Sequence, residues 1–133
     1  MLRRVRQNPE AAIQRQVVSH LRMYLPSEVW WTASMSGVSL SPQAASRAKA
    51  LGMRKGFPDL SFIWPDGSTS YLELKAPKGR LTPEQAALAK TLADRMDVCT
   101  SLVAVVRVLD LWMAAHGLRW LTDTEAYRRS TCP

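Results

Sequence analysis

Residues 56–75 have the sequence GFPDLSFIWPDGSTSYLELK, and this stretch predicts a β-hairpin. In its first half, Leu60, Phe62 and Trp64 alternate with other residues, as in a strand that buries one face. Residues 65–68, PDGS, are a strong turn signal. The second half is therefore expected to return beside the first as its partner strand.

Helical and strand patterns alternate along the rest of the chain. The expected elements are, in order, a helix of about 15 residues from Asn8-Pro9, a strand over 29–33, a helix over 43–51, the hairpin strands over 59–64 and 70–75, a helix that Thr82 caps, a strand over 102–106 and a helix over 109–116. Because residues 102–106, LVAVV, are all apolar, this strand is expected to be central and covered on both faces. The order α-β-α-β-β-α-β-α predicts an α/β fold, with a mixed β-sheet flanked by helices on both faces.

The length of 133 residues fits a single domain over residues 1–133, with a core at about 8–117 and a basic tail at 118–133. Eighteen Lys and Arg residues against 11 Asp and Glu residues give a net charge of +7. A positive field of this size attracts polyanions, of which nucleic acid is the commonest. An anionic membrane surface is the rival partner, and solubility alone is the plainest explanation.

The cysteines and the hydropathy pattern exclude several other classes. Cys99 and Cys132 form neither a CxxC pair nor a Cys/His cluster, so neither a disulfide framework nor a zinc site is expected. No apolar run approaches the roughly 20 residues of a membrane span, and the basic N-terminus lacks the apolar core of a signal peptide. We therefore expect a cytoplasmic protein with no membrane partner.

Two carboxylates and a lysine lie on the predicted hairpin. Glu73 and Lys75 share one strand face because successive side chains alternate, and the turn brings Asp59 towards the Glu73 end. Carboxylate oxygens are ligands that Mg²⁺ prefers, and a bound metal polarises a phosphodiester and lowers the pKa of a bound water. A lysine there orients that water or stabilises developing charge. The alternative is an exposed ion pair of little energetic consequence.

The same residues resemble the signature of PD-(D/E)xK nucleases. Residues 56–59, GFPD, are followed by Glu73-Leu74-Lys75 on the partner strand. The next segment, KAPKGRLTPEQ, which ends at Gln85, closely resembles the segment after the catalytic lysine in the VRR-NUC family, the virus-type replication-repair nucleases. This resemblance implies a restriction-endonuclease-like fold.

The resemblance extends over about residues 8–115. Residues 10–14, EAAIQ, resemble the first helix of the family, and the apolar segment that ends at residues 105–107, VVR, resembles its last strand. Residues 94–99, DRMDVC, depart from the family pattern, which usually has a glycine between the preceding helix and that strand.

Site residues follow from the resemblance, position by position. Asp59 and Glu73 are implied to bind Mg²⁺ or Mn²⁺ together with the backbone carbonyl of Leu74, and Lys75 to position or activate the attacking water. Glu10 is implied to complete the acidic cluster, directly or through a water. No small-molecule cofactor is expected.

Gln85 is implied to support the site, but Gln85 and Glu10 also have structural explanations. Glu10 lies in the first turn of a helix, where the helix dipole favours a carboxylate. Gln85 follows Thr82 by three positions, as in a capping box, and the two roles of Gln85 are compatible. Basic residues flank the motif on both sides and are expected to contact DNA phosphates. They are Arg54, Lys55, Lys78 and Arg80.

We therefore expect a metal-dependent DNA endonuclease. The resemblance points to phage or repair enzymes, in a bacterial or phage-infected cell, that act on branched DNA such as four-way junctions or flaps. Paired symmetric cuts would require a homodimer. A non-catalytic DNA-binding module that retains the fold, and a restriction-type enzyme that recognises a short sequence, are the alternatives.

Overall fold

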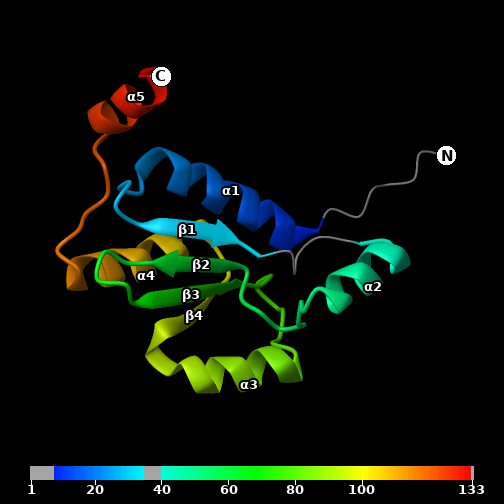
Figure 1. Ribbon diagram of the computed structural model, residues 1–133. Helices are drawn as coiled ribbons and strands as arrows, with labels where there is room; N and C mark the ends of the chain where they lie inside the picture. Colours follow the sequence, from blue (N-terminus) through cyan, green and yellow to red (C-terminus); the bar gives the residue numbers. More distant parts are fainter. Residues whose placement is uncertain (1–7, 35–39, 133) are drawn as a thin grey trace.

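A four-stranded mixed sheet forms the centre of the computed structural model, which describes residues 8–34 and 40–132 (Figure 1). The strands are β1 (Trp30–Ala33), β2 (Leu60–Ile63), β3 (Thr69–Leu74) and β4 (Met96–Cys99), and they lie side by side in this order. The β1–β2 and β2–β3 pairs are antiparallel, whereas β3 and β4 are parallel. The predicted mixed sheet is confirmed.

The predicted hairpin is formed by β2 and β3. Leu60 pairs with Leu72 and Phe62 with Ser70, so the alternating apolar residues of both strands share one face. Leu60, Phe62 and Leu72 have no exposed surface. The ring nitrogen of Trp64 donates a hydrogen bond of 2.8 Å to the hydroxyl of Ser70, which satisfies both polar groups inside the core.

Helices cover both faces of this sheet. On the apolar face lie α1 (Pro9–Tyr24) and α4 (Leu102–Ala115), whose side chains join the buried residues of β2 and β3 in one core. The helix α3 (Pro83–Leu92) packs beside β4 and leads into it through the short 3₁₀ turn η2 (Ala93–Arg95). The sheet face that carries Glu73 is therefore opposite to the main core.

One predicted strand is wrong. Residues 102–106 form the beginning of α4, and the last strand is β4, a short edge strand within the segment that departs from the family pattern. The apolar run continues at helical spacing through Val105, Leu109 and Met113, all of which are buried. The Ser101 hydroxyl accepts a hydrogen bond from the Ala104 amide at 3.1 Å and so caps the helix. A short apolar run alone does not distinguish a buried strand from a buried helix.

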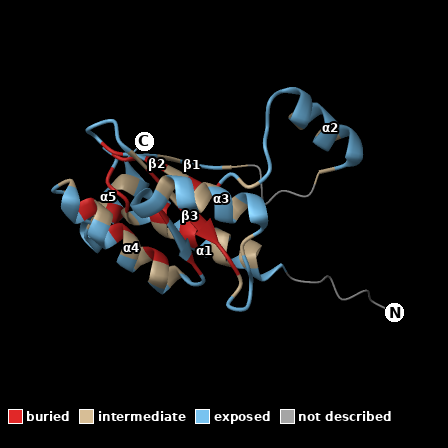
Figure 2. Cartoon of the chain, turned by 90° about the horizontal axis from the view of Figure 1, so that it is seen from below, coloured by how far each residue is buried: buried red, intermediate tan, exposed pale blue. Residues whose placement is uncertain are grey.

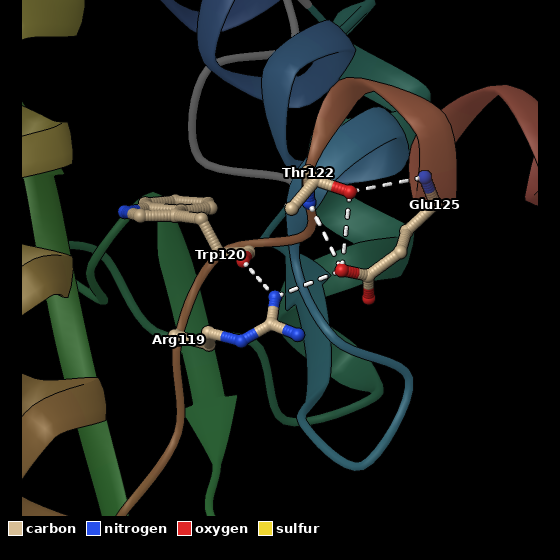
Figure 3. Close-up of polar contacts among 4 residues, drawn as sticks. All are labelled: Arg119, Trp120, Thr122 and Glu125. Carbon is tan, nitrogen blue, oxygen red and sulfur yellow. Dashed lines mark hydrogen bonds and ion pairs between the residues drawn. The ribbon is translucent and has the colours of Figure 1, made fainter.

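The unassigned C-terminal segment contains a helix, α5 (Asp123–Thr131), that packs on α1. Thr122 and Glu125 form a capping box at its start, and Arg119 donates hydrogen bonds to Glu125 (3.0 Å) and to the Trp120 carbonyl (2.9 Å) (Figure 3). This polar cluster satisfies backbone amide groups at the start of α5.

The helix α2 (Pro42–Ala50) follows β1 and precedes β2 in the sequence. It lies apart from the body of the molecule (Figures 1 and 2). Ser41 caps it and none of its residues is buried, whereas the central strands are largely buried. Among the described residues, no helix is both long enough and apolar enough to cross a membrane.

Candidate active site

Asp59 lies one residue before β2, at the end of the sheet where β3 finishes. The pairing of Leu60 with Leu72 continues by one step, so Asp59 stands opposite Glu73. The Asp59 carbonyl accepts a hydrogen bond of 2.8 Å from the Ser34 amide. Its side-chain Oδ2 accepts one of 2.7 Å from the Leu74 amide. These backbone contacts fix a carboxyl group that is only 9% exposed.

Glu73 is the most deeply buried charged residue of the described chain, at 2% exposure. Its Oε1 accepts a hydrogen bond of 2.9 Å from Nε2 of Gln85, and Nζ of Lys75 lies 3.9 Å from the same oxygen. Oε2 is buried and has no hydrogen-bond partner within the described part of the chain. A buried acceptor without a donor is unfavourable unless a proton or a cation satisfies it.

The electrostatics of the pair agree with this geometry. Burial and the nearby charge of Asp59 raise the pKa of Glu73 to about 8, against the opposing effect of Lys75. Burial also raises the pKa of Asp59, and the hydrogen bond from the Leu74 amide opposes this effect. The two carboxyl groups therefore retain a proton between them more readily than free carboxylates do.

Gln85 takes part in the capping box of α3 and also contacts Glu73. Its side-chain Oε1 accepts a hydrogen bond of 2.8 Å from the backbone amide of Thr82. Its backbone amide donates one of 3.2 Å to the Thr82 hydroxyl, which completes the capping box. The opposite end of the side-chain amide donates to Glu73. The start of α3 thus holds the Glu73 carboxylate in place.

Gly56 has a structural role that the motif alone does not reveal. Its φ is +88°, and a Cβ atom at this position would lie 2.7 Å from Cβ of Glu84 and 3.2 Å from the amide nitrogen of Gln85. The loop before Asp59 can therefore approach the start of α3 only because residue 56 has no side chain. The sequence signal for this close approach is a glycine three positions before the aspartate.

Glu10 lies near the pair but is less closely integrated with it. It is half-buried in the first turn of α1, its charge raises the pKa of Asp59, and it lines the same groove as Asp59. The predicted DNA-contacting residues are all exposed, on the loops that enter β2 and leave β3. They are Arg54, Lys55, Lys78 and Arg80.

The donor set fits a hard divalent cation bound largely by non-protein oxygens. Among the described residues, no group of three or more His, Cys, Asp or Glu side chains is arranged as a metal site. Mg²⁺, however, is typically held by one or two carboxylates, with waters and substrate phosphates completing its shell. The orphaned Oε2 of Glu73, next to the second buried carboxyl group of Asp59, meets that requirement.

Comparison with known proteins gives one match. The family model described as the VRR-NUC domain matches residues 8–110, which include the whole hairpin, Glu10 and Gln85. No curated protein and no solved structure matched the chain in the comparisons made with them. The family match covers most of the 133 residues and spans the sheet and the acidic pair. The chain therefore belongs to the VRR-NUC family, whose domain is a nuclease domain of the PD-(D/E)xK type.

Proposed function

We propose that the protein is a metal-dependent endonuclease that hydrolyses DNA phosphodiester bonds with Mg²⁺ or Mn²⁺. The observation that carries the proposal is the buried Oε2 of Glu73, which has no donor among the described residues and stands beside the carboxyl group of Asp59. Buried acceptors in proteins are nearly always hydrogen-bonded, so an oxygen that only a proton shared with Asp59 or a bound cation can satisfy favours a cation site. A cation there would satisfy the oxygen and displace the retained proton.

Each residue of the proposed site has a separate role. Asp59 and Glu73 would hold the metal, with the Leu74 carbonyl as a further ligand, and the metal would supply Lewis acidity and a more acidic water. Lys75 positions the attacking water or stabilises charge on the phosphate. Glu10 completes the acidic cluster, either directly or through a water molecule.

The substrate proposed is branched DNA, such as a four-way junction or a flap. The basic residues Arg54, Lys55, Lys78 and Arg80 would neutralise backbone phosphates on both sides of the acidic pair. A domain of this size has little surface with which to recognise a base sequence, so we propose that this domain selects DNA by its shape. Two cuts related by symmetry require two sites, and we therefore propose a homodimer.

Cleavage of labelled linear, flapped and four-way DNA, with Mg²⁺ or with EDTA, tests the proposal. We expect metal-dependent cleavage that is fastest on the branched substrates, and a loss of at least about 100-fold in Lys75→Ala. Full activity in Lys75→Ala would contradict the assigned site. DNA binding that is independent of Mg²⁺ and unaccompanied by cleavage would indicate a binding module. Discrete fragments from long linear DNA would indicate a sequence-specific enzyme.

A further inference from the structure

An open groove of about 540 Å³ lies along α1 and includes Asp59 of the acidic pair in its lining. Its α1 wall consists of residues that recur every three or four positions between Asn8 and Met23, which is one continuous face of the helix. At 1.5 Å per residue, this wall is about 22 Å long. Ser34 and Asp59 line the groove from the sheet side. The proposed reaction centre therefore opens into a long channel rather than a closed pocket.

Charge is distributed unevenly along this channel. Glu10 and Asp59 lie among its lining residues near the start of α1, whereas Arg15 and Arg22 line it further along. Both arginines are exposed, and neither forms an ion pair with a carboxylate within residues 8–34 and 40–132. Two arginines without a carboxylate partner, in a groove that extends from the proposed metal site, favour the binding of a polyanion.

We propose that this groove holds the nucleic-acid strand on one side of the scissile phosphate, with Arg15 and Arg22 bound to its phosphates; this inference rests on the nuclease function proposed above. The arginines are seven residues apart on the same face, a rise of about 10 Å. One strand of B-DNA advances about 3.4 Å per nucleotide, so the two guanidinium groups are suited to phosphates about three nucleotides apart. Val18 and Met23 line the same groove and offer apolar contacts for sugars or bases.

A purely structural role is the alternative for at least one arginine. Arg22 lies in the last turn of α1, where a cation interacts favourably with the helix dipole. Such a role would appear as a change in thermal stability and not as a change in DNA affinity. Binding measurements with matched variants therefore separate the two roles.

The test compares two double variants that remove the same charge. Arg15→Gln/Arg22→Gln alters the groove, while Arg95→Gln/Arg107→Gln alters two exposed arginines that do not line it among the described residues. The affinity for a fluorescein-labelled four-way junction is measured in Ca²⁺ over a range of NaCl concentrations, with thermal unfolding as the check on folding. We expect the groove variant to bind 10- to 100-fold more weakly, and its log–log salt slope to fall in magnitude by about 1.4 to 1.8. The control should change by less than about threefold.

A second variant, Ser19→Glu, places a negative charge in the groove at an exposed position. It should weaken binding as well, and unaltered affinity in both groove variants would overturn the inference. Equal weakening in the groove and control variants would also overturn it, because net charge alone would then explain binding. If the wild type cleaves DNA with Mg²⁺ and the groove variants behave like it, the groove assignment fails and the nuclease function stands. If the wild type neither binds nor cleaves DNA, both fail.

Discussion

Glu73 is almost completely buried, yet the rest of the described chain offers a hydrogen bond to only one of its two carboxylate oxygens. In the metal-free protein, burial and the neighbouring Asp59 raise the pKa of Glu73 to about 8. Below its ordinary pKa of 4.5, Glu73 is protonated in the folded and the unfolded chain. As the pH rises towards 8, the folded chain retains a proton that the unfolded chain has lost, so the free energy of unfolding falls, by at most about 1.4 kcal/mol per pH unit.

Glu73→Gln should therefore stabilise the metal-free protein at pH 8 while it abolishes cleavage. A glutamine keeps the acceptor for Gln85 and carries no charge to desolvate. In EDTA, we expect the Tm of this variant to exceed that of the wild type by at least about 5 °C at pH 8, and by much less at pH 5. Glu28→Gln, which alters an exposed glutamate, is the control and should show no such widening with pH. A Tm difference that is the same at both pH values would refute this explanation.

Gln85 and Thr82 provide a matched pair at the start of α3. Both take part in the capping box, but only Gln85 also contacts Glu73. Thr82→Ala and Gln85→Ala should each reduce the free energy of unfolding by about 1 kcal/mol. Only Gln85→Ala should also slow cleavage, by about 10-fold or more, because the Glu73 carboxylate loses its support. Equal cleavage rates in the two variants would show that Gln85 is only a cap.

The sequence was sufficient to indicate Asp59, Glu73 and Lys75 as one group, because the turn and the strand alternation bring them to one end of a hairpin. It did not determine the register, and hence not the hydrogen bond from the Leu74 amide that fixes Asp59. The orphaned oxygen of Glu73 could not be predicted either, since it depends on the elements packed around that side chain.

At the scale of elements, the hairpin was predictable and the last strand was not. In β2 and β3, the alternation of apolar residues and the turn residues both indicate a hairpin, and the packing in the folded chain is consistent with it. Residues 102–106 are all apolar, so this segment alone shows neither helical nor strand periodicity. Only the spacing of the buried positions further along α4 identifies the helix. β4 is four residues long and carries the exposed Asp97, which gives little strand signal.

A comparison of alanine variants at Gly56 and Gly67 distinguishes the effect of backbone strain from the effect of a steric clash. Their φ values are similar, +88° and +85°, but a Cβ at Gly67 meets nothing within 4 Å, whereas at Gly56 it would meet Glu84. Gly67→Ala should cost about 1–2 kcal/mol of stability from the left-handed conformation alone and leave cleavage per folded molecule unchanged. Gly56→Ala should cost more and should also lower kcat by about 10- to 100-fold, because α3 and Gln85 must shift. Indistinguishable unfolding and cleavage data for the two variants would argue against the close approach.

The homodimer proposed for the whole molecule needs a contact surface, and among the described strands β1 is one of the two edges of the sheet. β1 is an edge strand, and it carries Trp30 at 75% exposure opposite Ile63 at 47%. If this edge contributes to the proposed homodimer, Trp30→Lys should shift the sedimentation coefficient from dimer to monomer at micromolar concentration. Leu111→Lys changes an equally exposed apolar residue on α4 and is the control. A monomeric wild type would contradict the dimer, and a Trp30→Lys dimer of normal strength would place the interface elsewhere.

The helix α5 was missed because its apolar content is low and its stability depends on α1. The Tyr24 hydroxyl donates a hydrogen bond of 2.9 Å to Asp123, and Arg129 donates one of 3.1 Å to the Arg22 carbonyl. These contacts join residues about a hundred positions apart in the sequence, so no local pattern reveals them. The C-terminal segment thus packs on α1 through α5.

If Asp59 and Glu73 bind a divalent cation, the protein should bind Mn²⁺, which electron paramagnetic resonance of the free ion measures. We expect saturable binding to the wild type and at least about 10-fold weaker binding to Asp59→Asn, in which the amide oxygen can still accept the Leu74 hydrogen bond. Asp97→Asn, at an exposed position on β4, should bind Mn²⁺ as the wild type does. Equal Mn²⁺ affinity in the wild type and Asp59→Asn would show that the acidic pair is not the metal site.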